Sequence, residues 1–296
     1  MILVVGATGK TGSAVVGELT GRGWPTRAMA HSSVPESWAE SAGLSGRGEY
    51  DIVVGSFEDP PSLDAAVAGC DAVYLVSPPG PAQRVQERAV IEATLRAGTG
   101  AHLVKIGSLG MGHPAAGRIG AQHDAIRRDL AESGLPWTVL ALNQLSHNLF
   151  LYADAVLGHG VLPVPAGDAR ISWLAVADVA RVAAEVLTTP GHVGRTYELT
   201  GPQALHHAEV AAMLAAAVGR DVGYVDIPPE TAFAAMTGIG LPEWTAHGLV
   251  ETNEFYRTGG GQVVTDAVEQ LGGTPAATLP DFIDQHFGAM AGSSSS

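Results

Sequence analysis

The 296-residue chain has one cysteine, Cys70, so it cannot form an internal disulfide, and it has no cysteine cluster for zinc. Cys70 precedes an apolar run, which is typical of a small buried residue rather than a nucleophile. The eleven histidines form no His-Glu-x-x-His or similar cluster. The sequence therefore predicts no disulfide and no metal site.

Positive charge is also scarce. Sixteen lysines and arginines stand against thirty aspartates and glutamates, which gives a net charge of −14. This balance argues against nucleic acid and anionic membrane surfaces as direct partners, since both need a basic surface. No apolar run approaches the roughly 18 residues of a membrane helix, and residues 1–6 show no signal-peptide pattern. We therefore expect a cytoplasmic protein.

Short apolar runs alternate with helical stretches in the first half of the chain. We expect strands at 2–5, 26–30, 51–54, 72–76, 102–106 and 138–142, with helices that include 11–20, 84–96 and 121–133. Near-continuous apolar strands separated by helices are typical of a sheet that is covered on both faces. The predicted fold class is therefore α/β, with a Rossmann-type, doubly wound parallel sheet.

The pattern changes after about residue 145. Helices are expected at 177–188, 207–218, 229–236, 242–256 and 278–286, with short strands at 196–199 and 223–227. We predict a first domain over 1–145, on which 176–190 packs, and a smaller, mostly helical lobe over 146–290. Residues 291–296, which are rich in serine, are expected to be a flexible tail.

A glycine-rich turn, Gly6-Ala7-Thr8-Gly9-Lys10-Thr11-Gly12, joins the first expected strand to the first helix. Gly6 permits a tight turn, Gly9 allows backbone amides to approach a pyrophosphate, and Gly12 allows the helix to pack closely on the strand. A P-loop would need a glycine where Val4 stands, so an NTPase is not expected. The turn makes the first domain a candidate dinucleotide-binding domain.

The second expected strand ends without an acidic residue to bind an adenosine 2′-hydroxyl. Arg27, His31 and Ser32 are instead candidates to bind a 2′-phosphate. The sequence therefore favours NADP(H), and NAD(H) remains possible.

Several further segments support a family resemblance. These are Gly55–Leu63, Gly69–Pro78, Val104–Gly110, Ser133–Leu140 and Tyr197–Pro202. With the glycine turn, they resemble the NmrA-like branch of the atypical short-chain dehydrogenases/reductases over roughly residues 1–287. Members of this family include NAD(P)H:quinone oxidoreductases, triphenylmethane reductases and regulators that bind NADP without turnover.

The resemblance implies roles for the matched positions. Residues 6–12 would bind the pyrophosphate, and Ser56 and Phe57 would lie along the adenine. Ser77, Pro78 and Lys105 would approach the ribose and nicotinamide, and Asn143 would lie near the nicotinamide. His31 stands where many members have a 2′-phosphate-binding arginine.

The Tyr-x-x-x-Lys pair of the short-chain dehydrogenases is absent, because no tyrosine has a lysine four positions later. In that pair the tyrosine exchanges a proton with the substrate oxygen. The remaining candidates for proton transfer are His123 and Tyr152, and Lys105 is a further catalytic candidate. Helix-face packing is the alternative for His123, and core packing is the alternative for Tyr152.

We therefore expect an NAD(P)H-dependent reductase whose acceptor needs little acid catalysis, such as a quinone, an enone or another conjugated or aromatic small molecule. The acceptor would bind in a cleft between the lobes. Two alternatives remain open: an NADP(H)-binding redox sensor without turnover, and a non-redox tailoring enzyme on the same scaffold. A homodimer or a partner protein is possible under each.

Overall fold

The computed structural model describes residues 1–33, 38–41, 44, 48 and 50–290, so the expected tail at 291–296 lies outside the described residues. The chain forms two compact units. Unit 1 comprises Met1–Ser108, Gln122–Ala141 and Val176–Tyr197, and unit 2 comprises Leu109–Ala121, Leu142–Ala175 and the chain from Glu198 onward. Residues 109–121, which follow the fifth expected strand, thus belong to unit 2, and residues 176–197 belong to unit 1.

Unit 1 is built on a seven-stranded sheet with the order β3-β2-β1-β4-β5-β6-β9. The strands are β1 (Ile2–Val5), β2 (Thr26–Ala30), β3 (Tyr50–Val54), β4 (Ala72–Leu75), β5 (His102–Ser108), β6 (Trp137–Leu142) and β9 (Arg195–Leu199). The pairings from β3 to β5 are parallel, with Leu3 opposite both Arg27 and Val73. The strand order reverses between β1 and β4, which is where ligands bind in open α/β sheets.

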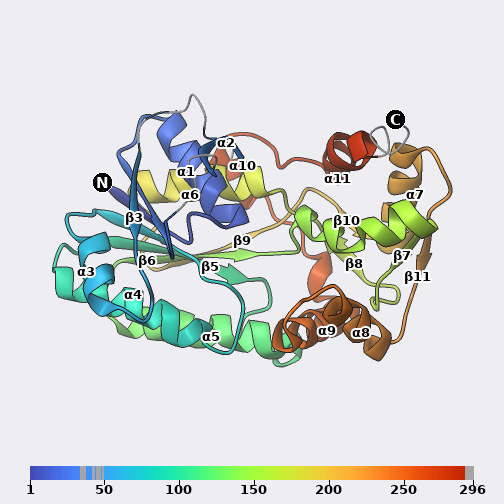
Figure 1. Cartoon of the computed structure of the whole chain (residues 1–296), viewed down its shortest axis with the longest axis horizontal. Coiled ribbons are helices and arrows are strands. Elements are labelled where there is room, and N and C mark those ends of the chain that lie inside the picture. The colour runs from blue at the N-terminus through green and yellow to red at the C-terminus, as the bar shows by residue number, and fades with distance from the viewer. Residues whose placement is uncertain (34–37, 42–43, 45–47, 49, 291–296) are drawn as a thin grey trace. The chain divides into compact units, whose positions relative to one another are not determined.

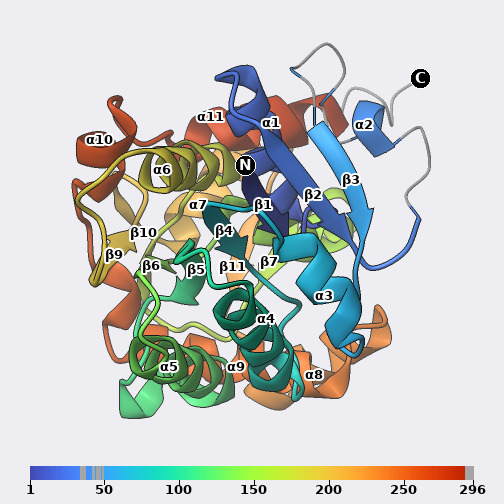
Figure 2. The same cartoon turned by 90° about the vertical axis from the view of Figure 1, so that its left-hand side faces the viewer.

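Helices cover both faces of this sheet (Figures 1 and 2). On one face lie α1 (Lys10–Gly21) and α6 (Val176–Thr188), which pack against each other. On the other lie α3 (Pro60–Val67), α4 (Gln83–Ala97) and α5 (Gly117–Glu132). Leu3, Val73 and Leu103 project from neighbouring strands into the apolar core beneath α3 and α4. The doubly wound parallel fold predicted from the sequence is confirmed.

A four-residue helix, α2 (Trp38–Ser41), lies between β2 and β3. Unit 2 contains the helices α7 (His207–Val218), α8 (Pro229–Gly238), α9 (Glu243–Arg257), α10 (Ala267–Gly272) and α11 (Leu279–Ile283). Two small sheets accompany them: β8 (Arg170–Ser172) pairs antiparallel with β10 (Ala204–His206), and β7 (Val161–Pro163) pairs parallel with β11 (Gly223–Val225). The core of unit 2 gathers around Trp173, Phe282 and Phe287. Among the described helices, none is long and apolar enough to cross a membrane.

The first turn of α7 places a histidine in the core of unit 2. The helix begins with a capping box, in which the His206 ring accepts from the Ala208 amide and the Glu209 carboxylate accepts from the His206 amide. His207 is thereby turned inward, where its ring stacks on Tyr224 and meets Trp173 edge-on. Burial, with a smaller contribution from His206, lowers the pKa of His207 to about 4.

This buried imidazole predicts a loss of stability in mild acid. The pKa of His207 is lower in the folded chain than the roughly 6.5 of an unfolded chain, so its contribution is fully present above pH 6.5. The contribution is lost as the pH falls from 6.5 towards 4, and amounts to about 3 kcal/mol. Urea unfolding of wild type and His207→Gln at pH 7.5 and 4.5 measures it. The free energy of unfolding should change less between the two pH values in His207→Gln than in the wild type. In His159→Gln, which alters an exposed histidine, it should change as much as in the wild type. Equal dependence in all three proteins would contradict the prediction.

Candidate functional site

The glycine turn lies at the carboxyl end of β1, next to the end of β4. Gly6 has a φ of +72°, and a Cβ on this residue would lie 2.6 Å from the carbonyl oxygen of Val76. A Cβ on Gly12 would overlap the carbonyl oxygen of Gly6. The turn therefore has no room for a side chain at either glycine, and the start of α1 lies directly on it.

The first turn of α1 presents backbone amides that no side chain caps. Gly9 is the N-cap residue, with extended backbone and no side-chain hydrogen bond, and the first turn contains no acidic residue. Thr8, Gly9 and Lys10 are exposed, whereas Thr11 and Gly12 are buried. Free N–H groups, the positive end of the helix dipole and one lysine together fit an anionic group such as a pyrophosphate.

The ends of β2 and β3 adjoin this turn. The Ala7 amide donates to the Met29 carbonyl (3.3 Å), and the Gly55 amide donates to the Ala30 carbonyl (2.9 Å). His31 and Ser32, which follow β2, are exposed, and Ser56 and Phe57, which follow Gly55, are half-buried. The structure thus brings the residues expected at the pyrophosphate, adenosine and 2′-phosphate to one edge of the sheet.

Arg27 is the exception among the expected cofactor contacts. It lies near the amino end of β2, opposite Leu3, rather than at the edge that carries the glycine turn. Its guanidinium donates to the carbonyls of Ala66 (2.7 Å) and Ala68 (2.9 Å), where α3 ends. This position does not support the expected contact with a 2′-phosphate, because the side chain already satisfies carbonyls that the helix leaves unpaired.

We expect Arg27→Ala to destabilise the chain by about 1–2 kcal/mol, because the carbonyls of Ala66 and Ala68 would lose a charged donor. The dissociation constants of NADPH and NADH should stay within about twofold of wild type. His31→Ala should instead weaken NADPH binding and leave NADH binding unchanged. Urea unfolding and fluorescence titration measure the two effects. If Arg27→Ala no longer bound NADPH more tightly than NADH, the result would indicate that Arg27 contacts the 2′-phosphate after all.

Three other expected site residues, Ser77, Lys105 and His123, meet in one buried cluster. The Lys105 Nζ lies 2.8 Å from Glu87 Oε2 and 3.2 Å from His123 Nδ1. The Ser77 hydroxyl donates to Glu87 Oε1 (2.9 Å), and the Gln83 amide approaches the same oxygen (3.3 Å). Pro78, the next residue, is exposed at the end of β4.

Glu87 and Gln83 were not among the residues expected at the site. The buried residues of α4 include Gln83, Glu87, Val90, Ile91 and Thr94, which recur at intervals of three and four. That spacing places the side chains of Gln83 and Glu87 on the apolar face of the helix. It was the signal in the sequence from which their burial could have been predicted.

Burial dominates the electrostatics of this cluster. It lowers the pKa of the Lys105 ammonium, an effect that the Glu87 carboxylate partly offsets. Burial, followed by the charge of Lys105, holds the pKa of His123 well below its usual range. His123 is therefore a neutral imidazole at physiological pH.

Asn143 and Tyr152 belong to unit 2. The Asn143 amide donates to the Ser172 hydroxyl (2.6 Å) and to the Gly261 carbonyl (2.8 Å), so these contacts hold the loop after β6. Tyr152 is half-buried against the core of unit 2. Burial, with a smaller contribution from Tyr224, raises the pKa of Tyr152 to about 12, which keeps the phenol protonated.

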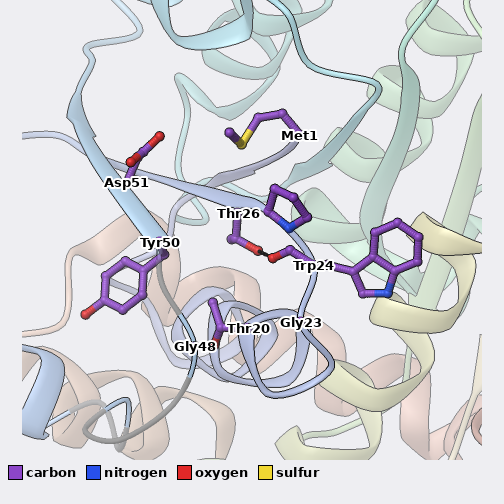
Figure 3. A pocket seen from close by; sticks show the side chains of 9 residues that line it. Met1, Thr20, Gly23, Trp24, Thr26, Gly48, Tyr50 and Asp51 are labelled. Carbon is purple, nitrogen blue, oxygen red and sulfur yellow. Dashed lines mark hydrogen bonds between the residues drawn. The ribbon is translucent and has the colours of Figure 1, made fainter.

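A cavity of about 390 Å³ lies elsewhere in unit 1 (Figure 3). Its lining includes Met1, Trp24, Thr26, Tyr50 and Asp51, which stand at the amino ends of β1, β2 and β3. It is therefore at the opposite edge of the sheet from the glycine turn. Across the described part of the chain, no group of three or more histidine, cysteine, aspartate or glutamate side chains is arranged to hold a metal ion.

Known proteins resemble this chain over almost its whole length. NAD(P)H azoreductase of Xenophilus azovorans is 37% identical over 293 residues, which are 98% of this chain and 99% of that protein. The (4-alkanoyl-5-oxo-2,5-dihydrofuran-3-yl)methyl phosphate reductase of Streptomyces griseus is 32% identical and covers 98% and 99% of the two chains. The crystal structure of the Escherichia coli NADPH-dependent quinone oxidoreductase complexed with NADPH matches with a TM-score of 0.85 at 28% identity. That match covers 97% of this chain and 100% of that one. The model of the NmrA-like family matches residues 1–282, and the chain therefore belongs to the NmrA-like family.

Proposed function

We propose that this protein is an NAD(P)H-dependent reductase that transfers hydride to a quinone, an azo compound or another conjugated small molecule. The observation that carries the proposal is the glycine turn, which opens an uncapped helix N-terminus at the point where the strand order reverses. The similarity of this chain to an NAD(P)H azoreductase and to a quinone oxidoreductase solved in complex with NADPH supports the same function.

The sheet-containing unit 1 holds the dinucleotide in this proposal. The amides of residues 10–12, with the side chains of Thr8 and Lys10, hold the pyrophosphate. His31 and Ser32 hold the 2′-phosphate, so NADP(H) is preferred and NAD(H) is tolerated. Ser56 and Phe57 flank the adenine, and Pro78 borders the ribose. The bound cofactor supplies the hydride.

Two residues expected at the site, Tyr152 and Asn143, belong to unit 2. Tyr152 offers a protonated phenol, since its pKa is raised to about 12. Asn143 positions the loop after β6 through its contacts with Ser172 and Gly261. Orientation of the acceptor and exclusion of water are then the main contributions of the chain.

The acceptor class follows from the missing Tyr-x-x-x-Lys pair. Reduction of a simple ketone places charge on one oxygen, which needs a strong proton donor in the transition state. A quinone or an azo group spreads the added charge over a conjugated system, so acid catalysis contributes less. His123 donates the proton in this proposal, and the buried Lys105 acts through His123 rather than on the substrate.

A single titration tests this function. Nicotinamide fluorescence is followed while NADPH or NADH is added, and menadione or an azo dye is then added to the same sample. We expect tighter binding of NADPH than of NADH, followed by continuous oxidation. Binding without oxidation across several acceptors would favour the redox-sensor alternative. Absence of binding by either nucleotide would reject the proposal.

A further inference from the structure

Lys105 stands at a core position of the sheet. It is opposite Leu75 in the register of β4 and β5, and it is two residues beyond the buried Leu103 on the same face of β5. Its side chain and that of Glu87 are both 0% exposed. A buried ion pair is rarely kept for stability, because apolar residues of similar volume usually do as well or better. We therefore expect the Lys105–Glu87 pair to have a role in function.

Three acceptors surround the Lys105 ammonium, and it has three N–H groups to donate. The acceptors are the Glu87 carboxylate, the carbonyl oxygen of Ile106 and His123 Nδ1. An N–H at His123 Nδ1 would point at the ammonium, so Nδ1 must carry a lone pair. His123 is therefore the neutral tautomer that bears its proton on Nε2.

Both carboxylate oxygens of Glu87 have partners in the cluster. Its Oε1 accepts hydrogen bonds from Ser77, Gln83 and Lys105, and its Oε2 lies 2.8 Å from the Lys105 Nζ. Burial, with a smaller contribution from the charge of Glu87, raises the pKa of the Tyr74 phenol in β4, which keeps that group neutral. The charged members of the cluster are thus Glu87 and Lys105 alone, from α4 and β5.

Ser77 and His123 are the most exposed members of the cluster. Lys105 and Glu87 are 0% exposed, whereas Ser77 is 6% exposed and His123 is 8% exposed. Of these two, His123 contacts the Lys105 ammonium. A proton that leaves Lys105 therefore has His123 as its acceptor on the way out, since the other groups on the ammonium are a carboxylate that it balances and a backbone carbonyl.

We propose that the buried Lys105–Glu87 pair fixes the tautomer of His123 and supplies the proton that His123 delivers to the reduced substrate. This inference rests on the proposed function, in which His123 is the proton donor. Lys105 and Glu87 are positioning and proton-storing residues, and they do not touch the substrate.

Hydride addition leaves a negative charge on the substrate, and the Nε2–H bond of His123 breaks as the new substrate–H bond forms. A proton passes from Lys105 Nζ to His123 Nδ1, so the lysine becomes a neutral amine and the imidazole stays neutral. Water then returns a proton to Nε2 while the Nδ1 proton returns to Lys105, and the net proton comes from solvent.

The ¹⁵N resonances of His123 test the tautomer without any turnover. In the wild type we expect an unprotonated Nδ1 and a protonated Nε2, with no charging of the ring near pH 6.5. In Lys105→Met the tautomer preference should be lost and the ring should titrate closer to pH 6.5. His123→Gln assigns the signals, and Glu92→Gln is the matched control, because Glu92 is an exposed partner of Arg88 on the same helix. A wild-type ring protonated at Nδ1 would overturn the inference.

Kinetics with menadione test the relay. An imidazolium acid would lose activity about tenfold per pH unit above its pKa near 6.5. The relay predicts no such loss until Lys105 itself deprotonates. Lys105→Met and Glu87→Gln should lower kcat about 100-fold or more while the dissociation constant of NADPH stays within about threefold. Unchanged kcat in a folded Lys105→Met would also overturn the inference. A wild type with the expected tautomer but no turnover would reject the proposed function and leave the tautomer assignment standing.

Discussion

Gly12→Ala should abolish measurable dinucleotide binding, with a dissociation constant for NADPH raised by at least about 100-fold, or about 2.7 kcal/mol. The added methyl group would overlap the carbonyl oxygen of Gly6. The helix and the turn must therefore separate, which moves the amides at residues 10–12 away from one another. Fluorescence titration with NADPH measures the loss, and circular dichroism checks that the sheet and helices remain.

Two other glycines are the controls for this variant. A Cβ on Gly9 would lie 3.3 Å from the Gly6 carbonyl oxygen, so Gly9→Ala should fold and lose less affinity than Gly12→Ala. A Cβ on Gly238, in α8, meets nothing within 4 Å, so Gly238→Ala should bind NADPH as the wild type does. Equal affinity in Gly12→Ala and Gly238→Ala would show that the turn is structural only.

Lys105→Met should lower the free energy of unfolding by about 3–5 kcal/mol, because it leaves the Glu87 carboxylate buried without its cation. The loss should be greater at pH 8 than at pH 5. Without Lys105, an ionised Glu87 is buried with no cation beside it, and protonation at the lower pH relieves that charge. Urea unfolding at both pH values measures this.

The double variant Lys105→Met/Glu87→Gln distinguishes the cost of an unpaired buried charge from the cost of altered packing. It removes both charges, keeps a side chain for Ser77 to contact, and should be about 2 kcal/mol more stable than Lys105→Met alone. Arg88→Met, which breaks an exposed pair on the same helix, should cost less than about 1 kcal/mol. A double variant less stable than either single variant would indicate that packing, rather than charge, dominates at this position.

Most of the sheet-containing unit could be predicted from the sequence. β1 and β2 begin and end where the apolar runs do, and α4 exceeds its expected range by one residue at each end. The regular alternation of buried strands and amphipathic helices is a strong signal, since each element buries a continuous set of apolar residues. The strands β7, β8 and β10 were missed, because a three-residue strand is too short to show a period.

The site could be predicted less completely. The glycine turn is a local motif, so its residues and their neighbours at the strand ends were identified together. Arg27 was predicted to bind the 2′-phosphate, but it lies near the amino end of β2. The sequence of a single strand does not show which end of the sheet a long side chain reaches. The spacing of Glu87 along α4 was a local signal of its burial, but its partner Lys105 lies 18 positions further along the chain. Pairing between distant elements leaves no local pattern in one sequence.

The interleaving of the two units has a consequence for synthesis of the chain. The sequence passes from one unit to the other five times, after residues 108, 121, 141, 175 and 197. The face of α1 that packs on α6 is translated long before its partner, which ends at Thr188. At roughly 5–20 residues per second, α1 waits on the order of 10–30 s on the ribosome for the helix that covers it. Completion of the sheet-containing unit is therefore a late event in translation, and a gene shortened after residue 145 would produce a chain with an uncovered apolar helix face.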